Sequence, residues 1–163
     1  MNAIVSVTRD WGIGLEGGLL VRNREDMRFF RRATMGGTVV CGRTTFQSFP
    51  GGALKGRRNV VISTNPDFLP TGAEVVHSVD EALAAVQNED PNSVWLIGGQ
   101  SVYEQLLPHC QRAYVTKHDV VVPADAFFPN LDELDDWVVE KTEDGGITPS
   151  GVPFAFVTYQ HVR

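Results

Sequence analysis

Short runs of apolar and β-branched residues recur along most of the chain, and several lead into a stretch with apolar residues at helical spacing. Runs of this length, bounded by glycine, proline or asparagine, predict buried strands. The expected strands span residues 3–7, 38–42, 59–63, 74–77, 93–97 and 113–120. The expected helices span residues 23–35, 43–48, 79–87 and 101–107.

The last part of the chain changes to strands alone, because residues 137–142 and 154–162 predict an antiparallel pair. Strands that alternate with helices favour a parallel sheet. The expected fold class is therefore α/β: a single domain over residues 1–163 with a mixed, mostly parallel central β-sheet, flanking helices and an antiparallel C-terminal hairpin. A chain of this length fits one domain with a sizeable core.

The charge is unevenly distributed. The net charge is −6, yet nine lysines and arginines between Arg22 and Arg58 face only Glu25 and Asp26, which leaves this segment at +7. An acidic protein with one basic segment suits small anionic ligands such as phosphates and carboxylates, and it argues against nucleic acid. For the arginines of the first expected helix, exposure to solvent is the simpler interpretation.

Other features bound the compartment and the chemistry. No apolar run approaches the length of a membrane span, and the N-terminal residues lack the pattern of a signal peptide, so a cytoplasmic protein is expected. Cys41 and Cys110 stand alone and are expected to be buried thiols. The four histidines, at 77, 109, 118 and 161, show no ligand spacing, so no metal is expected.

A glycine-rich segment follows the first expected strand. Residues 12–17, GIGLEG, match the dinucleotide pattern GxGxxG, but no helix opens on the last glycine, as that fingerprint requires. Four glycines within seven residues instead predict a mobile loop that folds over a ligand.

Asp26 is the most informative residue of the first expected helix. At 100° per residue it lies at the centre of an apolar arc that includes Phe30, Ala33 and Met27. A carboxylate in such a place is costly and has a raised pKa, as a functional acid would. Asn23 is also a good N-cap, however, and an acid in the first turn often serves only the helix dipole. The helix alone leaves both interpretations open.

Three expected strands end in groups that suit a phosphorylated cofactor. They are residues Gly42, Arg43, Thr44 and Thr45 after the second strand, Ser63 and Thr64 after the third, and Gly98, Gly99, Gln100 and Ser101 after the fifth. In open α/β sheets, ligands bind beyond the carboxyl ends of the strands. The Gly98-Gly99 pair alone is more often a tight turn, but with Arg43 it indicates a cofactor stretched across several strand ends.

The chain as a whole resembles bacterial dihydrofolate reductase. The segments that carry the resemblance are residues 11–14, Asp26 with Phe30, residues 40–46, 56–60, 97–104, 114–116 and 125–129, all in the order and spacing of that family. The resemblance implies NADPH-dependent reduction of 7,8-dihydrofolate to 5,6,7,8-tetrahydrofolate, a step of one-carbon metabolism that antifolate inhibitors block. Hydride would pass to C6 of the pterin and a proton to N5, with a water admitted by the glycine loop as the last donor.

The resemblance also implies roles for single residues. Asp26 would bind the 2-amino group and N3 of the substrate, with Thr116 bonded behind it, and Arg57 would hold the α-carboxylate of its glutamate tail. The pterin pocket would be lined by Ile4, Val5, Met27, Phe30, Phe49 and Leu54. NADPH would be held at its adenosine end by Arg43, Thr44, Ser63 and Thr64, at its pyrophosphate by Thr45 and residues Gly98, Gly99, Gln100, Ser101 and Val102, and at its nicotinamide by Ile13, Gly14 and Tyr103. In the family a cis peptide joins the two glycines.

Two departures from the family concern ligand contacts. Val21 stands where the family commonly has a tryptophan that orders a water near the pterin carbonyl, and Thr44 stands where a histidine is frequent. Two alternative functions are a reductase of the same fold acting on a pyrimidine of the riboflavin pathway, and a non-catalytic nucleotide-binding module. Asp26 with Arg57 argues against the first, and the intact Asp26 and glycine loop argue against the second. A monomer is expected, because no helix has a spare apolar face.

Overall fold

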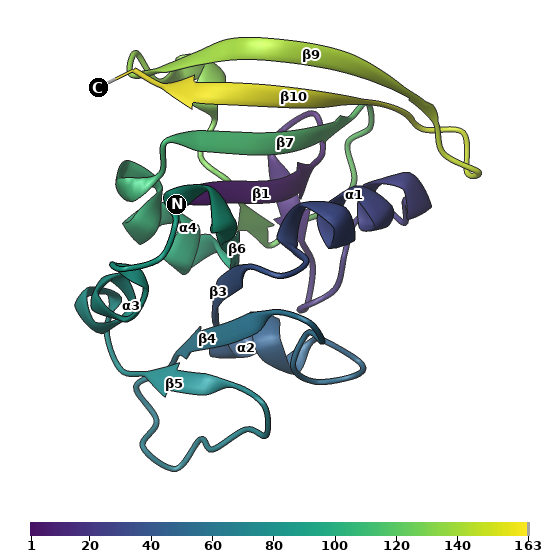
Figure 1. Cartoon of the computed structure of the whole chain (residues 1–163). Helices are drawn as coiled ribbons and strands as arrows, with labels where there is room; N and C mark the ends of the chain where they lie inside the picture. Colours follow the sequence, from purple (N-terminus) through teal and green to yellow (C-terminus); the bar gives the residue numbers. More distant parts are fainter. Residues whose placement is uncertain (163) are drawn as a thin grey trace.

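The computed structural model describes residues 1–162, which form one large mixed sheet with helices packed against it (Figure 1). The strands are β1 (Asn2–Val7), β2 (Gly12–Gly14), β3 (Thr38–Gly42), β4 (Arg58–Ile62), β5 (Glu74–Val76), β6 (Val94–Gly98), β7 (Arg112–His118), β8 (Ala126–Phe127), β9 (Trp137–Ile147) and β10 (Pro153–His161). The α-helices are α1 (Arg24–Thr34), α2 (Arg43–Gln47), α3 (Val79–Val86) and α4 (Gln100–Leu106). Short 3-10 helices span Pro91–Ser93, Leu107–His109 and Leu131–Glu133.

Eight strands make up the main sheet, in the order β5-β4-β3-β6-β1-β7-β10-β9. The pairs from β5 to β7 are parallel, and β10 pairs antiparallel with both β7 and β9. Figure 1 shows the β9–β10 hairpin along one edge of the sheet and β5 at the other. The predicted fold class, mostly parallel with an antiparallel C-terminal hairpin, is confirmed.

The central strands are apolar on both faces because helices cover them. On one face, Val5, Val40 and Leu96 pack in a cluster with α4. On the other face, Ile4 and Val39 pack in a second cluster that includes Phe30 of α1. Since neighbouring residues of a strand point to opposite faces, Ile4 and Val5 belong to different clusters.

Three local features differ from the sequence prediction. The glycine-rich segment expected to be a mobile loop contains β2, which pairs with β8 more than a hundred residues later. The helix expected to end before Pro108 begins at Gln100 and continues as a 3-10 helix through Leu107–His109. Strand β9 extends to Ile147, past the expected end, because β10 pairs with it along its length.

Within the described residues, no helix combines the length and the apolar character that crossing a membrane requires. Cys41 and Cys110 are both buried free thiols, as predicted.

Candidate active site

Asp26 lies in the first turn of α1 and turns its carboxylate toward the sheet. Asn23 is the N-cap, and its side-chain oxygen accepts a hydrogen bond from the Asp26 amide at 3.2 Å. The carboxylate itself accepts a hydrogen bond from Thr116 Oγ1 on β7, at 2.5 Å between the oxygens. The side chain of Asn23 therefore caps the helix. The carboxylate of Asp26 is not needed as a cap and faces Thr116 instead.

Burial has a clear effect on this carboxylate. It raises the pKa of Asp26 to about 6, because the charged form loses solvation, and the hydrogen bond from Thr116 opposes the shift. Thr116 is buried in the middle of β7, between its partners Ser6 on β1 and Phe156 on β10, so its hydroxyl is firmly placed. The site therefore holds a carboxyl group with a pKa raised to about 6, a direction that suits acid–base chemistry at neutral pH.

The expected pterin pocket is partly assembled around this acid. Four of its residues belong to the apolar cluster on the α1 face of the sheet: Ile4, Phe30, Phe49 and Leu54. Val5 lies in the opposite cluster with α4, so its side chain does not join them. Met27 is 57% exposed, on the outer part of the expected apolar arc. The structure therefore brings four of the six residues together.

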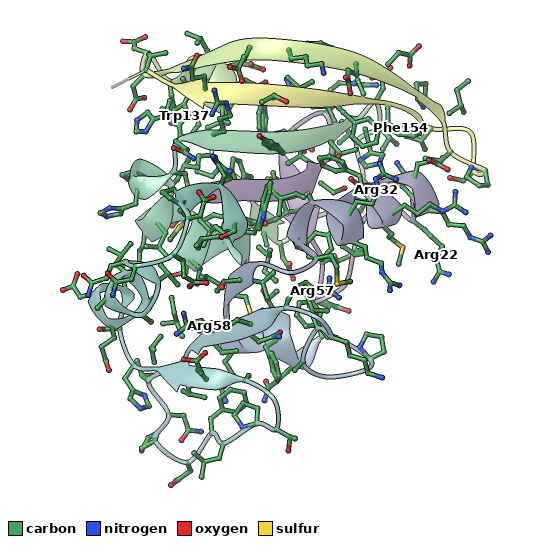
Figure 2. All side chains as sticks on the ribbon, in the orientation of Figure 1. Arg22, Arg32, Arg57, Arg58, Trp137 and Phe154 are labelled. Carbon is green, nitrogen blue, oxygen red and sulfur yellow. The ribbon has the colours of Figure 1, made fainter. Side chains whose placement is uncertain are left out.

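Arg57 and Arg58 are neighbours with different surroundings. Arg58 is held in ion pairs with Glu74 and Glu89 and is a structural residue. Arg57 makes no ion pair with any residue in 1–162; its guanidinium donates to the Lys55 carbonyl at 3.0 Å and to Thr34 Oγ1 at 3.2 Å. Burial and the nearby Arg31 lower the pKa of Arg57. Figure 2 shows Arg57 beside α1. An anion bound there would relieve the repulsion between the guanidinium groups of Arg57 and Arg31.

The expected cofactor residues follow three adjacent parallel strands. Gly42 of β3 is in register with Ile62 of β4, and Cys41 is in register with Gly98 of β6, so all three strands end at one edge. The side chains of Arg43, Thr44 and Thr64 are exposed there. Ser63 is buried and its hydroxyl accepts a hydrogen bond from the Asn65 amide at 3.2 Å, so it is the least accessible of this group.

A second part of this edge is built from glycine. The Gly98-Gly99 peptide bond is cis, as the resemblance implies. A Cβ atom at Gly99 would lie 3.2 Å from Thr45 Oγ1, and one at Gly98 would lie 3.2 Å from the Tyr103 ring. The main chain of Gly98 and Gly99 is thus not covered by side chains of its own, and it lies beside the Thr45 hydroxyl. This arrangement suits a pyrophosphate.

Four other residues expected to bind the cofactor have contacts of their own. Tyr103 is buried and donates its hydroxyl to the Ile4 carbonyl at 2.7 Å, which joins α4 to β1. Val102 is buried close to Gly42, whereas Ser101 is exposed. The Gln100 side chain accepts a hydrogen bond from the Phe127 amide at 2.8 Å, so it holds β8.

Asp125, which has no role predicted from the sequence, holds the glycine-rich segment. The Asp125 amide donates to the Gly14 carbonyl at 2.9 Å, and its carboxylate accepts from the Glu16 amide at 2.9 Å. These bonds fix Gly14, and the neighbouring Ile13 is half-buried against the apolar cluster that includes Val5 and Val7 of β1. Only the pairing of β2 with β8 identifies this residue, since an aspartate in a loop carries no specific signal.

No group of three or more His, Cys, Asp or Glu side chains suited to a metal ion occurs in residues 1–162. The donor set consists of one arginine, several hydroxyls and bare main chain at the strand ends. Its chemistry fits a phosphorylated dinucleotide such as NADPH.

Comparison with known proteins agrees with this geometry. The family described as Dihydrofolate reductase matches residues 1–161. Dihydrofolate reductase of Mycobacterium tuberculosis (strain CDC 1551 / Oshkosh) is 41% identical over 152 residues, which cover 90% of this chain and 89% of that protein. The enzyme of Neisseria gonorrhoeae is 38% identical over 135 residues, covering 83% of this chain and 82% of the other.

A solved structure gives the same result. Dihydrofolate reductase from Enterococcus faecalis complexed with NADP(H) and RAB-propyl superposes with a TM-score of 0.90 at 30% identity, covering 99% of this chain and 96% of that one. Neither the riboflavin-pathway reductase nor the non-catalytic module is favoured by these matches. The chain belongs to the dihydrofolate reductase family.

Proposed function

We propose that Asp26, held by Thr116, binds the pterin and favours its protonation in the reduction of 7,8-dihydrofolate to 5,6,7,8-tetrahydrofolate. As a member of its family, the protein is an NADPH-dependent oxidoreductase that catalyses this reaction. The observation that carries the role of Asp26 is its carboxylate, turned to the sheet, with a pKa raised to about 6 by burial.

The chemistry of Asp26 follows from its charge and from Thr116, the one side chain among residues 1–162 that donates a hydrogen bond to its carboxylate. An ionised carboxylate is an acceptor, and Thr116 satisfies only part of its capacity. A substrate with an amino group beside a ring N–H supplies the missing donors. The negative charge then favours a protonated pterin, which accepts hydride more readily than the neutral ring.

The rest of the substrate is held by apolar and cationic side chains. Phe30, Phe49, Leu54 and Ile4 exclude water around the pterin and its benzoyl group. Val5 and Met27 contribute less, because Val5 faces α4 and Met27 faces solvent. Arg57 binds a carboxylate of the glutamate tail in two parallel hydrogen bonds, the arrangement for which a guanidinium is suited.

NADPH, when bound, supplies the hydride that reaches the pterin. Arg43, Thr44, Ser63 and Thr64 hold its 2′-phosphate and adenosine, while Thr45 and the main chain of residues 98–102 hold the pyrophosphate. Ile13 and Gly14 shield the reacting end from water, and Asp125 keeps them in place. Tyr103 acts indirectly, since its hydroxyl is bonded to the Ile4 carbonyl.

We also propose a single-domain, cytoplasmic monomer that binds no nucleic acid. The main sheet includes strands from both ends of the chain, which supports one domain over residues 1–163. The two free cysteines suit a reducing compartment. Among the described residues, the three most exposed large apolar side chains, Leu69, Leu19 and Ile147, lie on separate segments. Sedimentation equilibrium measures the mass in solution, which should be that of one chain, 17.9 kDa, if the protein is a monomer.

The activity is tested by following NADPH absorbance with two substrates in parallel. Dihydrofolate should be consumed with one NADPH per turnover, whereas a riboflavin-pathway pyrimidine bearing a ribose phosphate should not. Asp26→Asn should abolish most of the dihydrofolate activity at neutral pH. Glu25→Gln is the matched control, because Glu25 is the adjacent carboxylate on α1 and its ion pair with Arg28 lies on the surface. Equal activity of the two variants would refute the role of Asp26.

A further inference from the structure

A buried histidine lies behind the first turn of α1. His118 is on β7, two residues after Thr116, so the two side chains project from the same face of the strand. Only 1% of His118 is exposed. Its ring packs on Phe154 of β10, with 5.8 Å between the ring centroids, and Figure 2 shows Phe154 at the α1 end of the hairpin. None of the proposed substrate or cofactor contacts uses this histidine.

Both ring nitrogens of His118 have polar neighbours. Nε2 lies 3.0 Å from Nδ2 of Asn23, the N-cap of α1. Nδ1 lies 3.3 Å from the Val7 carbonyl oxygen and 3.3 Å from Ser6 Oγ. The other end of the Asn23 amide, Oδ1, accepts the hydrogen bond from the Asp26 amide. A continuous chain of contacts thus runs from β1 through His118 and Asn23 to Asp26.

The direction of these bonds fixes the proton on the ring. Asn23 Oδ1 faces the Asp26 N–H, so the NH2 group of Asn23 faces Nε2 of His118. Nε2 must therefore accept, and the single proton of the neutral ring is on Nδ1, facing the Val7 carbonyl. A doubly protonated ring would set two donors against each other at Asn23. Turning the amide would relieve that contact, but it would put NH2 against the Asp26 N–H and remove the cap.

The surroundings keep the ring neutral. The groups that face it from β1, from β10 and from the N-cap carry no charge; they are Ser6, Val7, Phe154 and Asn23. The adjacent Lys117 and Asp119 make ion pairs elsewhere, at 3.0 Å with Asp132 and at 2.8 Å with Arg9. Burial lowers the pKa of His118, and the hydrogen bond to Val7 offsets this only in part.

We propose that neutral His118 is a positioning residue that, through Asn23, holds the first turn of α1 and so sets the Asp26 carboxylate against Thr116. Protonating His118, or removing its acceptor nitrogen, frees the Asn23 amide and loosens the cap. The bond from Thr116 to Asp26 then weakens, and because that bond lowers the pKa of Asp26, the pKa rises. The consequence for catalysis rests on the proposed function of Asp26.

Two NMR measurements on the full chain test the link directly. The ¹⁵N shifts of the His118 ring should report a neutral ring with the proton on Nδ1 at neutral pH and still at pH values just below the ordinary histidine pKa. The ¹³C shift of the Asp26 carboxyl gives its pKa in each variant. His118→Leu should raise that pKa by about 0.5–1 unit, the size expected when one hydrogen bond is weakened.

Comparison variants separate this role from simple packing. His118→Gln keeps an acceptor for Asn23 without a titrating ring, so it should restore the Asp26 pKa toward the wild-type value. His161→Leu is the matched control: His161 is half-buried on β10 and bonded to Asp136, away from Asp26, and its loss should leave the Asp26 pKa unchanged. Asn23→Ala breaks the same chain of contacts from the α1 side and should give the same rise, which covers the case in which His118→Leu does not fold.

The hydride-transfer rate supplies the catalytic part of the test. Measured in single turnovers against pH, the rate of His118→Leu should fall about tenfold at neutral pH, the effect of a misplaced catalytic group, and His118→Gln should recover most of it. An Asp26 pKa that is unmoved in both His118→Leu and Asn23→Ala, or a ring proton found on Nε2, overturns the proposal. A shifted pKa with an unchanged rate would instead support the link and refute the proposed function of Asp26.

Discussion

Replacing Asp26 by asparagine should make the folded protein more stable than wild type at neutral pH. This gain in stability should shrink as the pH falls. In the folded state burial raises the pKa of Asp26 from 3.8 to about 6. An acid with a raised folded-state pKa binds more protons folded than unfolded between these two values, so folding stability falls as the pH rises through that window. At 1.36 kcal/mol per pKa unit, ionised Asp26 costs up to about 3 kcal/mol at pH 7.

Asparagine has nearly the same shape and accepts the Thr116 hydrogen bond, but it never ionises. The free energy of unfolding of Asp26→Asn minus that of wild type should therefore rise between about pH 4 and pH 6 and stay level above it, by about 2–3 kcal/mol in total. Urea denaturation at a series of pH values measures this difference, with Glu25→Gln as a surface control that should show little of it. A difference that does not change with pH would refute the buried, ionisable carboxylate.

Three further substitutions test ligand contacts. Arg43→Ala should weaken NADPH binding by about 1.5–3 kcal/mol and leave NADH binding nearly unchanged, because one charge-assisted bond to the 2′-phosphate is lost; equal losses in cofactor titrations would contradict this. Arg57→Lys should raise the KM for dihydrofolate about tenfold with kcat little changed, since a lysine lacks the paired donors; a fall in kcat alone would count against it. Val21→Trp, which introduces an indole N–H, should change dihydrofolate or antifolate affinity more than NADPH affinity in equilibrium titrations, and the reverse order would show that Val21 does not lie beside the pterin.

The sheet could be predicted because its strands are defined locally. The apolar runs at residues 38–42 and 93–97 differ from β3 and β6 by at most one residue at each end. The orientation of Asp26 could also be predicted, because helical periodicity alone places it on the same side as Phe30. The choice between a functional acid and an acid that serves only the helix dipole depends on the contact with Thr116. That residue lies ninety positions away in sequence.

The features that sequence could not give depend on tertiary pairing. Strand β2 contains two glycines and would not be predicted as a strand; it exists because β8 pairs with it. The end of β9, residues 143–147, is rich in acidic residues and glycine and is held extended by β10. His118 carries no motif, and its contact with Asn23 follows only from α1 packing across β1 and β7.

We expect above all that the charge of Asp26 drives protonation of the substrate. The most direct measurement is the pre-steady-state rate of hydride transfer in Asp26→Asn as a function of pH, with NADPH and dihydrofolate saturating. The rate at neutral pH should fall by about 10² or more and recover as the pH is lowered, because solvent then protonates the pterin without help. A rate close to that of wild type at neutral pH, in a variant that folds and binds NADPH normally, would show that the charge of Asp26 does not drive protonation of the substrate.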